Sequence, residues 1–274
     1  MRGRIIALCA AVAAGLLMTF PGASTAAADA ATQVHMTVPF YPAYPGFNDP
    51  GWTEIENATP AGTVTNAFVN FCDTSGNGPG CDNKPWGSKN TSWDSTIAGL
   101  QAAGVSPMGY TWSNYDKTPA ATVEKEILDW VRWYSVKHVF VDGASTHDAS
   151  YYCKLATYAI GHGVTRFEIN PGTNITSSNY ECAGTPAAGK VVIDAYEGPG
   201  GSAFSAWVPP KWMARYPGDL AVILATPGQA TSGMEADLSV ARADGVACFY
   251  EGTDTLYATL PSFFAQEVAS VASG

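Results

Sequence analysis

Short apolar runs of the kind that form β-strands recur along this chain and alternate with helix-like stretches, a pattern that few folds can accommodate. Eight such runs are recognisable: His35–Tyr41, Val64–Phe71, Val105–Trp112, His138–Asp142, Arg166–Asn170, Val191–Glu197, Leu220–Thr226 and Val246–Glu251. Most are apolar almost throughout, which is typical of parallel strands buried on both faces. Because parallel neighbours are joined by crossovers, usually helices, the pattern predicts an α/β protein.

Helical stretches are expected between most of these runs. They are Trp93–Ala103, Ala120–Ser135, Ala149–His162, Met234–Ala243 and Pro261–Ala272. Two crossovers are poorer, because the one around Trp52–Asn57 is short and Pro209-Pro210 interrupts the one after the sixth run. With 46% hydrophobic and 14% charged residues, the chain suits a single core. We therefore predict one α/β domain over residues 31–274, a single (β/α)8 TIM-type barrel.

The amino end has the features of a targeting segment. Arg2 and Arg4 give it a positive start, Ile5–Phe20 is apolar, and Ala26–Ala30 offers small residues for cleavage. The apolar run is short for a membrane-spanning helix. Residues 1–30 are therefore predicted to be a secretory signal peptide, and the mature protein is expected to be secreted, extracellular and without a membrane partner.

Export would permit disulfide bonds among the cysteines that follow residue 30. Cys72 and Cys81 bracket a turn-rich loop and form the pair expected first, and Cys153 with Cys182 is expected second. Cys248 lies inside an apolar run and is expected to be a buried thiol. With no C-x-x-C motif and scattered histidines, we expect neither a metal nor another cofactor.

In a (β/α)8 barrel the carboxyl ends of the strands meet around one mouth. The residues there are acids, amides and aromatics: Tyr41, Asn70, Tyr110, Trp112, Asp142, Asn170, Glu197, Thr226 and Glu251, with Tyr115 and Tyr196 close by. Converging carboxylates suit glycoside hydrolysis, and aromatic faces stack on sugar rings. Each acid could instead cap a helix. Lysine and arginine are missing from these positions, and the net charge of −10 disfavours nucleic acid and anionic membranes as partners.

Side-chain alternation helps to rank the acids. In a regular strand Asp194 and Tyr196 share one face while Glu197 lies on the other, so Asp194 and Glu197 cannot both point into the mouth. One of them is therefore expected to be structural. Glu168 lies deeper on the face of Asn170, where Arg166 could neutralise it, and is also expected to be structural.

Several motifs together resemble the spherulin-4 proteins, also called spherulation-specific family 4. They are Val38-Pro-Phe-Tyr-Pro42, Gly109-Tyr-Thr-Trp-Ser-Asn-Tyr115, Val139-Phe-Val-Asp142, Ile169-Asn-Pro-Gly-Thr173, Tyr196-Glu197, Phe249-Tyr-Glu251 and Leu260-Pro-Ser-Phe263. The resemblance implies a (β/α)8 glycoside hydrolase of the endo-α-1,4-polygalactosaminidase type. It implies as substrate α-1,4-linked galactosamine or N-acetylgalactosamine polymers, such as fungal galactosaminogalactan, and it puts the family's acids at Asp142 and Glu197.

The chain departs from the family at one position. The family's fourth strand usually ends in Asp-Glu, and here Gly143 follows Asp142. Losing one acid could abolish turnover, because an acid or base group typically supplies a rate factor of about 10² to 10⁴. Either Asp142 and Glu197 suffice, or Glu251 or Asp148 substitutes, or the barrel only binds carbohydrate. We expect a monomeric hydrolase.

Overall fold

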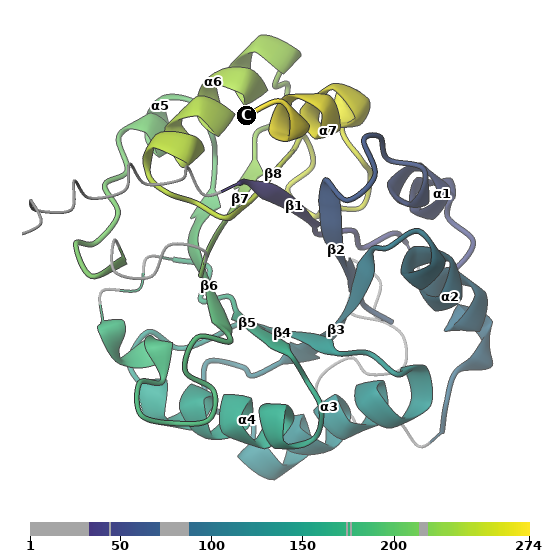
Figure 1. Cartoon of the computed structure of the whole chain (residues 1–274), viewed down its shortest axis with the longest axis vertical. Helices are drawn as coiled ribbons and strands as arrows, with labels where there is room; N and C mark the ends of the chain where they lie inside the picture. Colours follow the sequence, from purple (N-terminus) through teal and green to yellow (C-terminus); the bar gives the residue numbers. More distant parts are fainter. Residues whose placement is uncertain (1–32, 44, 72–87, 174, 176, 214–218) are drawn as a thin grey trace, which may run out of the picture. The chain divides into compact units, whose positions relative to one another are not determined.

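The computed structural model describes residues 33–43, 45–71, 88–173, 175, 177–213 and 219–274. Residues 31–274 form one compact unit, in which eight parallel strands close into a barrel in sequence order, with β8 paired to β1 (Figure 1). The strands are β1 (His35–Val38), β2 (Val64–Val69), β3 (Ser106–Trp112), β4 (His138–Asp142), β5 (Arg166–Ile169), β6 (Val191–Gly198), β7 (Leu220–Ala225) and β8 (Cys248–Gly252). The predicted (β/α)8 fold is confirmed.

Helices surround the ring of strands in Figure 1. They are α1 (Pro50–Glu56), α2 (Asp94–Ala102), α3 (Ala120–Tyr134), α4 (Ala149–Gly161), α5 (Ser202–Ser205), α6 (Thr231–Ala243) and α7 (Phe264–Ala272), with 3-10 helices η2 (Thr91–Trp93) and η3 (Ser178–Glu181). The two crossovers expected to be poor contain the short helices α1 and α5. Between β5 and β6 the described chain has only η3, so the barrel departs from strict strand–helix alternation there.

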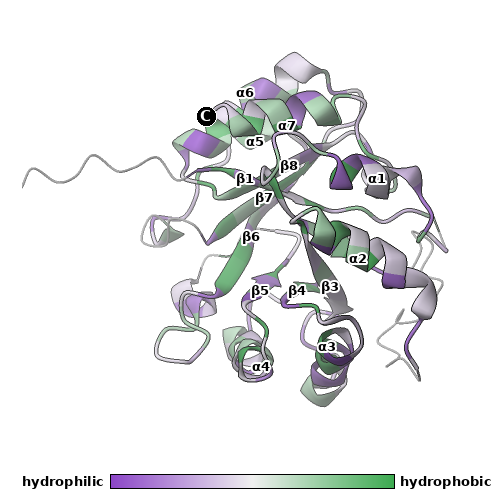
Figure 2. Ribbon diagram, turned by 45° about the vertical axis from the view of Figure 1, so that its right-hand side comes forward, coloured by the Kyte–Doolittle hydropathy of each residue, from purple (hydrophilic) through white to green (hydrophobic). Residues whose placement is uncertain are grey.

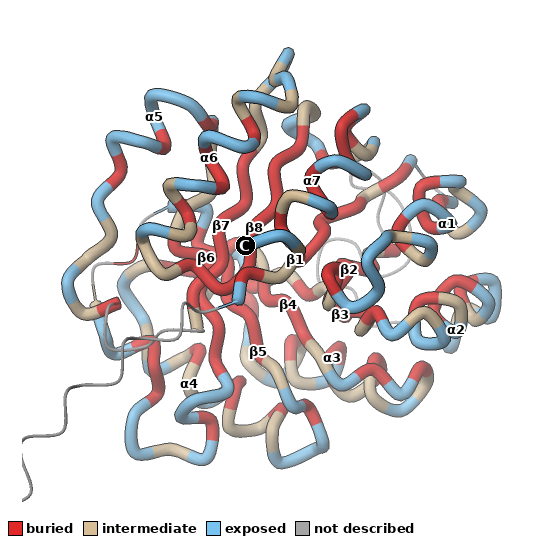
Figure 3. The backbone as a smooth tube through the Cα atoms, turned by 45° about the horizontal axis from the view of Figure 1, so that its top comes forward, coloured by how far each residue is buried: buried red, intermediate tan, exposed pale blue. Residues whose placement is uncertain are grey.

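Much of the apolar core packs between the strands and the helices, and the strands are coloured as largely hydrophobic and buried (Figures 2 and 3). Helix α3 illustrates how this layer forms, because it buries Ile127 and Trp130 against the sheet. The indole Nε1 of Trp130 donates a 2.9 Å hydrogen bond to the Tyr110 carbonyl. A Cβ at Gly109 would lie 2.4 Å from that indole, so only glycine lets the ring pack so close to β3.

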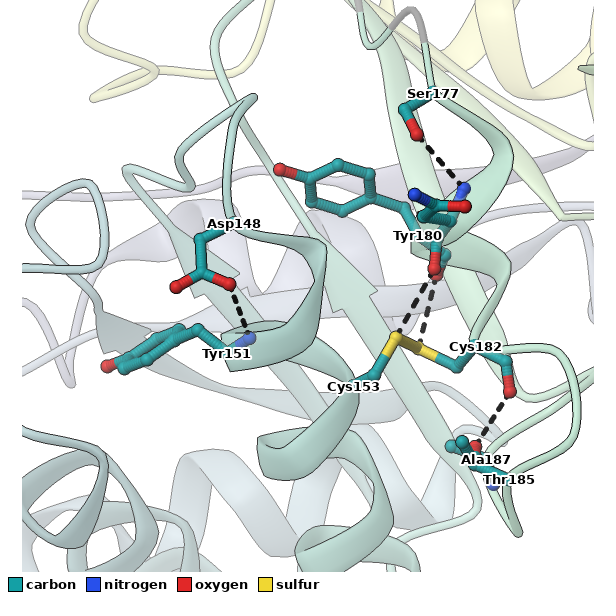
Figure 4. The surroundings of a disulfide bond; sticks show 9 residues. Asp148, Tyr151, Cys153, Ser177, Tyr180, Cys182, Thr185 and Ala187 are labelled. Atoms are coloured by element: carbon teal, nitrogen blue, oxygen red, sulfur yellow. Dashed lines mark hydrogen bonds between the residues drawn. A yellow bond between two sulfur atoms is a disulfide. The ribbon is translucent and has the colours of Figure 1, made fainter.

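Several further predictions can be compared with the structure. The disulfide Cys153–Cys182 is confirmed, and it joins α4 to the residue after η3 (Figure 4). Cys248 is a buried free thiol, as expected. The predicted signal peptide and the Cys72–Cys81 pair lie outside the described residues. Among the residues that are described, no helix has the length and apolar character needed to cross a membrane.

Candidate active site

A cavity of about 240 Å³ opens at the carboxyl ends of the strands. Its lining comes from strand ends and from the segment after β8: Pro39, Tyr41, Phe68, Asn70, Tyr110, Phe140, Asp142, Asn170, Glu197, Ile223, Thr255, Leu256 and Tyr257. Six of the residues predicted for the mouth are among them, namely Tyr41, Asn70, Tyr110, Asp142, Asn170 and Glu197. Neither lysine, arginine nor histidine belongs to this described lining, so the cavity is acidic and aromatic.

The two predicted catalytic carboxylates are held together by one amide. The Nδ2 of Asn170 donates to Asp142 Oδ1 at 3.1 Å and to Glu197 Oε2 at 2.9 Å. The two oxygens are therefore at most about 6 Å apart, an upper limit that lies toward the short end of the roughly 5 to 9.5 Å described for glycosidase carboxyl pairs. Asn170 is itself oriented by the backbone N–H of Gly172, which donates to its Oδ1 at 2.7 Å.

Asp142 is poised to hold a proton near neutral pH. Burial, and secondly the charge of Glu197, raise the pKa of Asp142 to about 7. Hydrogen bonds from the Gly143 N–H (2.7 Å), the Tyr110 hydroxyl (2.9 Å) and Asn170 oppose that rise, because they stabilise the charged form. A carboxyl group with this pKa can donate a proton at neutral pH and recover it.

Glu197 reaches the cavity because β6 is irregular. Along β7, Ala221 pairs with Asp194 and the next residue, Val222, pairs with Tyr196, so Ala195 is an extra residue in a β-bulge. The bulge changes the alternation, so Asp194 and Glu197 both face the barrel interior while Tyr196 faces outward. The premise of regular alternation was therefore wrong, although Asp194 does lie below the mouth and is fully buried.

Below the mouth, the barrel interior contains an ion pair. Glu168 accepts two hydrogen bonds from Arg166, at 3.0 and 2.6 Å, as the sequence predicted. Arg166 also lies 3.3 Å from the Cys248 sulfur, across the barrel from β5. Burial, together with the charges of Glu168 and Glu197, raises the pKa of Asp194 well above its ordinary value, which favours the protonated form of Asp194.

Four predicted binding residues lie away from the cavity lining. Trp112 and Tyr115 pack edge to face, 5.7 Å apart, beside Gly143, and Tyr115 is 49% exposed. Tyr196 packs against Phe204 and Trp207 on the outer side of β6.

Glu251 is the fourth of these residues. It faces the helices, is fully buried, and accepts a 2.8 Å bond from Gln229. Asp148, the other potential substitute for the missing acid, accepts from the Tyr151 N–H as the N-cap of α4. Neither acid lines the cavity.

Gly143 has a structural reason to be glycine. Its φ is +58°, and a Cβ there would lie 2.4 Å from the Trp112 ring. Its carbonyl accepts hydrogen bonds from the Tyr115 N–H (2.6 Å) and the Ser113 hydroxyl (2.8 Å). The indole of Trp112 thus occupies the space into which a side chain at this position would grow.

Seven lining residues were missed from the sequence. Pro39, Phe68, Phe140 and Ile223 are inward-facing by strand alternation, so counting back two residues from the predicted mouth residues finds the first three. Thr255, Leu256 and Tyr257 belong to an irregular segment, for which the sequence has no comparable signal. Within the described residues, no cluster of three or more His, Cys, Asp or Glu side chains could hold a metal ion.

Solved structures of low sequence identity share this fold. A GH18 chitinase from Pseudoalteromonas aurantia aligns with a TM-score of 0.57 and 11% identity, over 86% of this chain and 99% of its own. Cel5A (EG2) from Hypocrea jecorina gives 0.54 and 12%, over 83% and 92%. A beta-mannanase from Streptomyces thermolilacinus gives 0.51 and 12%, over 88% and 91%. At these identities the similarity shows the barrel fold.

Sequence comparison is more specific than the fold. No curated protein matches the chain significantly. A profile of spherulation-specific family 4, however, matches residues 35–271, which include every strand and nearly all of the helices described above. The protein therefore belongs to spherulation-specific family 4.

Proposed function

We propose that this protein is a secreted glycoside hydrolase that cleaves α-1,4-linked galactosamine or N-acetylgalactosamine polymers, with Asp142 and Glu197 as its catalytic pair. The observation that carries the proposal is the pair itself, joined through Asn170 inside an aromatic cavity at the strand ends. This is where (β/α)8 enzymes place their chemistry. Chitinase, EG2 and mannanase neighbours support a carbohydrate ligand for such a barrel.

The two acids have different roles in this proposal. Asp142, with its pKa raised to about 7, protonates the glycosidic oxygen as the bond to the leaving sugar breaks. Glu197, whose oxygens accept from Asn170 and Tyr257, attacks the anomeric carbon. Water, deprotonated by the now ionised Asp142, then breaks the bond between Glu197 and the sugar and restores both acids. A separation of at most about 6 Å favours this covalent, retaining route over inversion, which needs room for a water molecule between the carboxyl groups.

The cavity also bears on the substrate. Its volume of about 240 Å³ is below the roughly 300 to 1,000 Å³ of sites for drug-sized ligands, so it suits one sugar unit of a longer chain. Two acidic side chains in a cavity whose described lining contains no lysine, arginine or histidine favour a neutral or positively charged ligand. Galactosamine residues with free amino groups carry such a charge.

A binding protein without activity is the second candidate, and Gly143 is the observation that favours it. Both acids that could have replaced the family's second carboxylate lie outside the cavity, at the start of α4 and behind β8. If two carboxylates do not suffice, the aromatic cavity would still bind sugar.

The test is incubation of the purified protein with α-1,4-galactosaminan, acetylated and not, followed by measurement of new reducing ends. Asp142→Asn and Glu197→Gln should each lower turnover by about 10² or more. Glu54→Gln, an exposed acid on α1, is the control and should cut normally. Binding without new ends would support the second candidate. Retained activity in Asp142→Asn would refute the assignment.

Export is part of the proposal. The leader-like residues 1–30 and the disulfide Cys153–Cys182 both support it, because stable disulfides form in oxidising compartments. Mass spectrometry of the protein from culture medium should find an amino terminus near residue 30.

A further inference from the structure

A tight turn after β8 brings an unpredicted tyrosine to Glu197. Asp254 organises this turn with both carboxylate oxygens, accepting from the Leu256 N–H (3.0 Å) and the Ala258 N–H (2.8 Å). The Tyr257 N–H donates to the Asp254 carbonyl at 3.1 Å, and the Tyr257 carbonyl accepts from the Tyr41 N–H at 2.8 Å. The turn is thereby joined to Tyr41, in the segment that follows β1.

Tyr257 has a backbone conformation that tyrosine rarely adopts. Its φ is +53°, which lies in the left-handed region. A residue with a Cβ is destabilised there, because the Cβ comes too close to the following carbonyl oxygen. Such a conformation persists only where the surrounding contacts fix it, and these conformations cluster at functional sites. Here the contacts are the two hydrogen bonds that the Asp254 carboxylate accepts and the hydrogen bond from the Tyr41 N–H to the Tyr257 carbonyl.

The strained backbone directs the side chain into the cavity. Tyr257 is 7% exposed, and its hydroxyl donates to Glu197 Oε1 at 3.2 Å, while Asn170 donates to Oε2. Each oxygen of Glu197 thus accepts a hydrogen bond from a described side chain, and the two bonds together fix the plane of the carboxylate. Burial and the charge of Glu197 raise the pKa of Tyr257, so its hydroxyl remains a donor. The titratable groups near Glu197 are Asp142, Asp194, Tyr41, Tyr110 and Tyr257.

We propose that Tyr257 is a positioning residue for Glu197. The left-handed turn, which hydrogen bonds to Asp254 stabilise, places the Tyr257 hydroxyl against the Glu197 carboxylate. The same turn presents Leu256, which is 56% exposed at the cavity rim, as an apolar contact for the substrate. Two adjacent residues therefore have separate tasks: Tyr257 orients the attacking carboxylate and Leu256 contacts the sugar. The inference rests on the proposed function for its kinetic part only.

Kinetics of three variants test this division. Tyr257→Phe keeps the ring and removes one hydrogen bond, so kcat should fall about tenfold with KM nearly unchanged. Leu256→Ala should raise KM and spare kcat. Asp254→Ala should lower kcat in the wild type but add little to Tyr257→Phe, because it acts through the same side chain. Tyr158→Phe, on the outer helix α4, is the matched control and should leave both constants unchanged.

A measurement without substrate separates this inference from the proposed function. The ¹³C resonance of the Glu197 carboxyl, identified by its loss in Glu197→Gln, should move at fixed pH in Tyr257→Phe and in Asp254→Ala, but not in Tyr158→Phe. A shifted resonance in a protein that cuts no polymer would refute the hydrolase and keep the positioning role. An unshifted resonance, or additive losses of kcat in the double variant, would overturn the positioning role.

Discussion

Gly143→Ala should be unusually costly for a one-carbon change. A residue with a Cβ at φ +58° costs about 1 to 2 kcal/mol in the left-handed region. The new Cβ would also lie 2.4 Å from the Trp112 ring, and overpacking of this kind costs about 1 to 3 kcal/mol. We expect a loss of unfolding free energy of about 2 to 5 kcal/mol, measured by urea denaturation.

The two causes can be separated with a second glycine. Gly189 has φ +70°, and no heavy atom lies within 4 Å of the place that a Cβ would take there, so Gly189→Ala should cost only the backbone part, about 1 to 2 kcal/mol. In a Trp112→Ala background, Gly143→Ala should fall to the same value, a coupling of about 1 to 3 kcal/mol. Equal costs at the two glycines in the wild type, or strict additivity with Trp112→Ala, would refute the reasoning.

Gly143→Glu meets the same positive φ and the same Trp112 ring as Gly143→Ala. Restoring the family's Asp-Glu pair in this chain should destabilise the end of β4 and disturb the hydrogen bond from the Gly143 N–H to Asp142. We expect no gain in turnover from the single change. A gain would require that Trp112 moves aside readily, so the variant should be assayed with and without Trp112→Ala.

Three further predictions concern pH and disulfides. Burial raises the pKa of Glu126 to about 8. Its contribution to stability is therefore full below its pKa in the unfolded chain, about 4.5, and is lost as the pH rises through about 8. The urea midpoints at pH 5 and pH 8 should differ by less in Glu126→Gln than in the wild type. Tyr110→Phe removes a bond that lowers the pKa of Asp142, so the alkaline limb of the kcat/KM profile should move to higher pH, and an unmoved limb would argue against Asp142 as the acid. Replacing Cys153 and Cys182 by serine removes a disulfide that spans 29 residues and should lower the unfolding free energy by about 3 to 4 kcal/mol in chemical denaturation. A Cys72–Cys81 disulfide would close a shorter loop and should contribute roughly 2 to 3 kcal/mol. Thiols at these two positions that do not react in the secreted protein would confirm the pair.

The fold could be predicted from the sequence because parallel strands that are buried on both faces appear as nearly continuous apolar runs. Apolar runs such as His138–Asp142 mark strands whatever their neighbours do, and their spacing admits few topologies. Strand ends were less certain: β1 stops at Val38 and β2 at Val69, although Tyr41 and Asn70 still reach the cavity just beyond them. The prediction that these two residues lie at the mouth was therefore correct, although the predicted ends of the strands were off by a few residues.

The site could be predicted only in part, because residue types alone do not show which side chains of a strand point into the barrel and which point toward the helices. Glu251 lies near the end of its strand, as Asp142 does, yet Cys248 and Tyr250 take the inward positions of β8 and leave Glu251 among the helices. Tyr257 was missed because its place depends on a turn whose left-handed residue is not a glycine. Such a conformation follows from tertiary contacts and leaves little trace in the local sequence.

The extra residue in β6 has a consequence for insertions and deletions. Removing one residue from a buried strand normally turns every later side chain to the opposite face. Here Asp194 and Tyr196 already pair with consecutive residues of β7, Ala221 and Val222. Deleting Ala195 would therefore leave a continuous ladder with Glu197 still opposite Ile223 and still facing the interior. A chain of this family one residue shorter at this point would keep its acid in the same place.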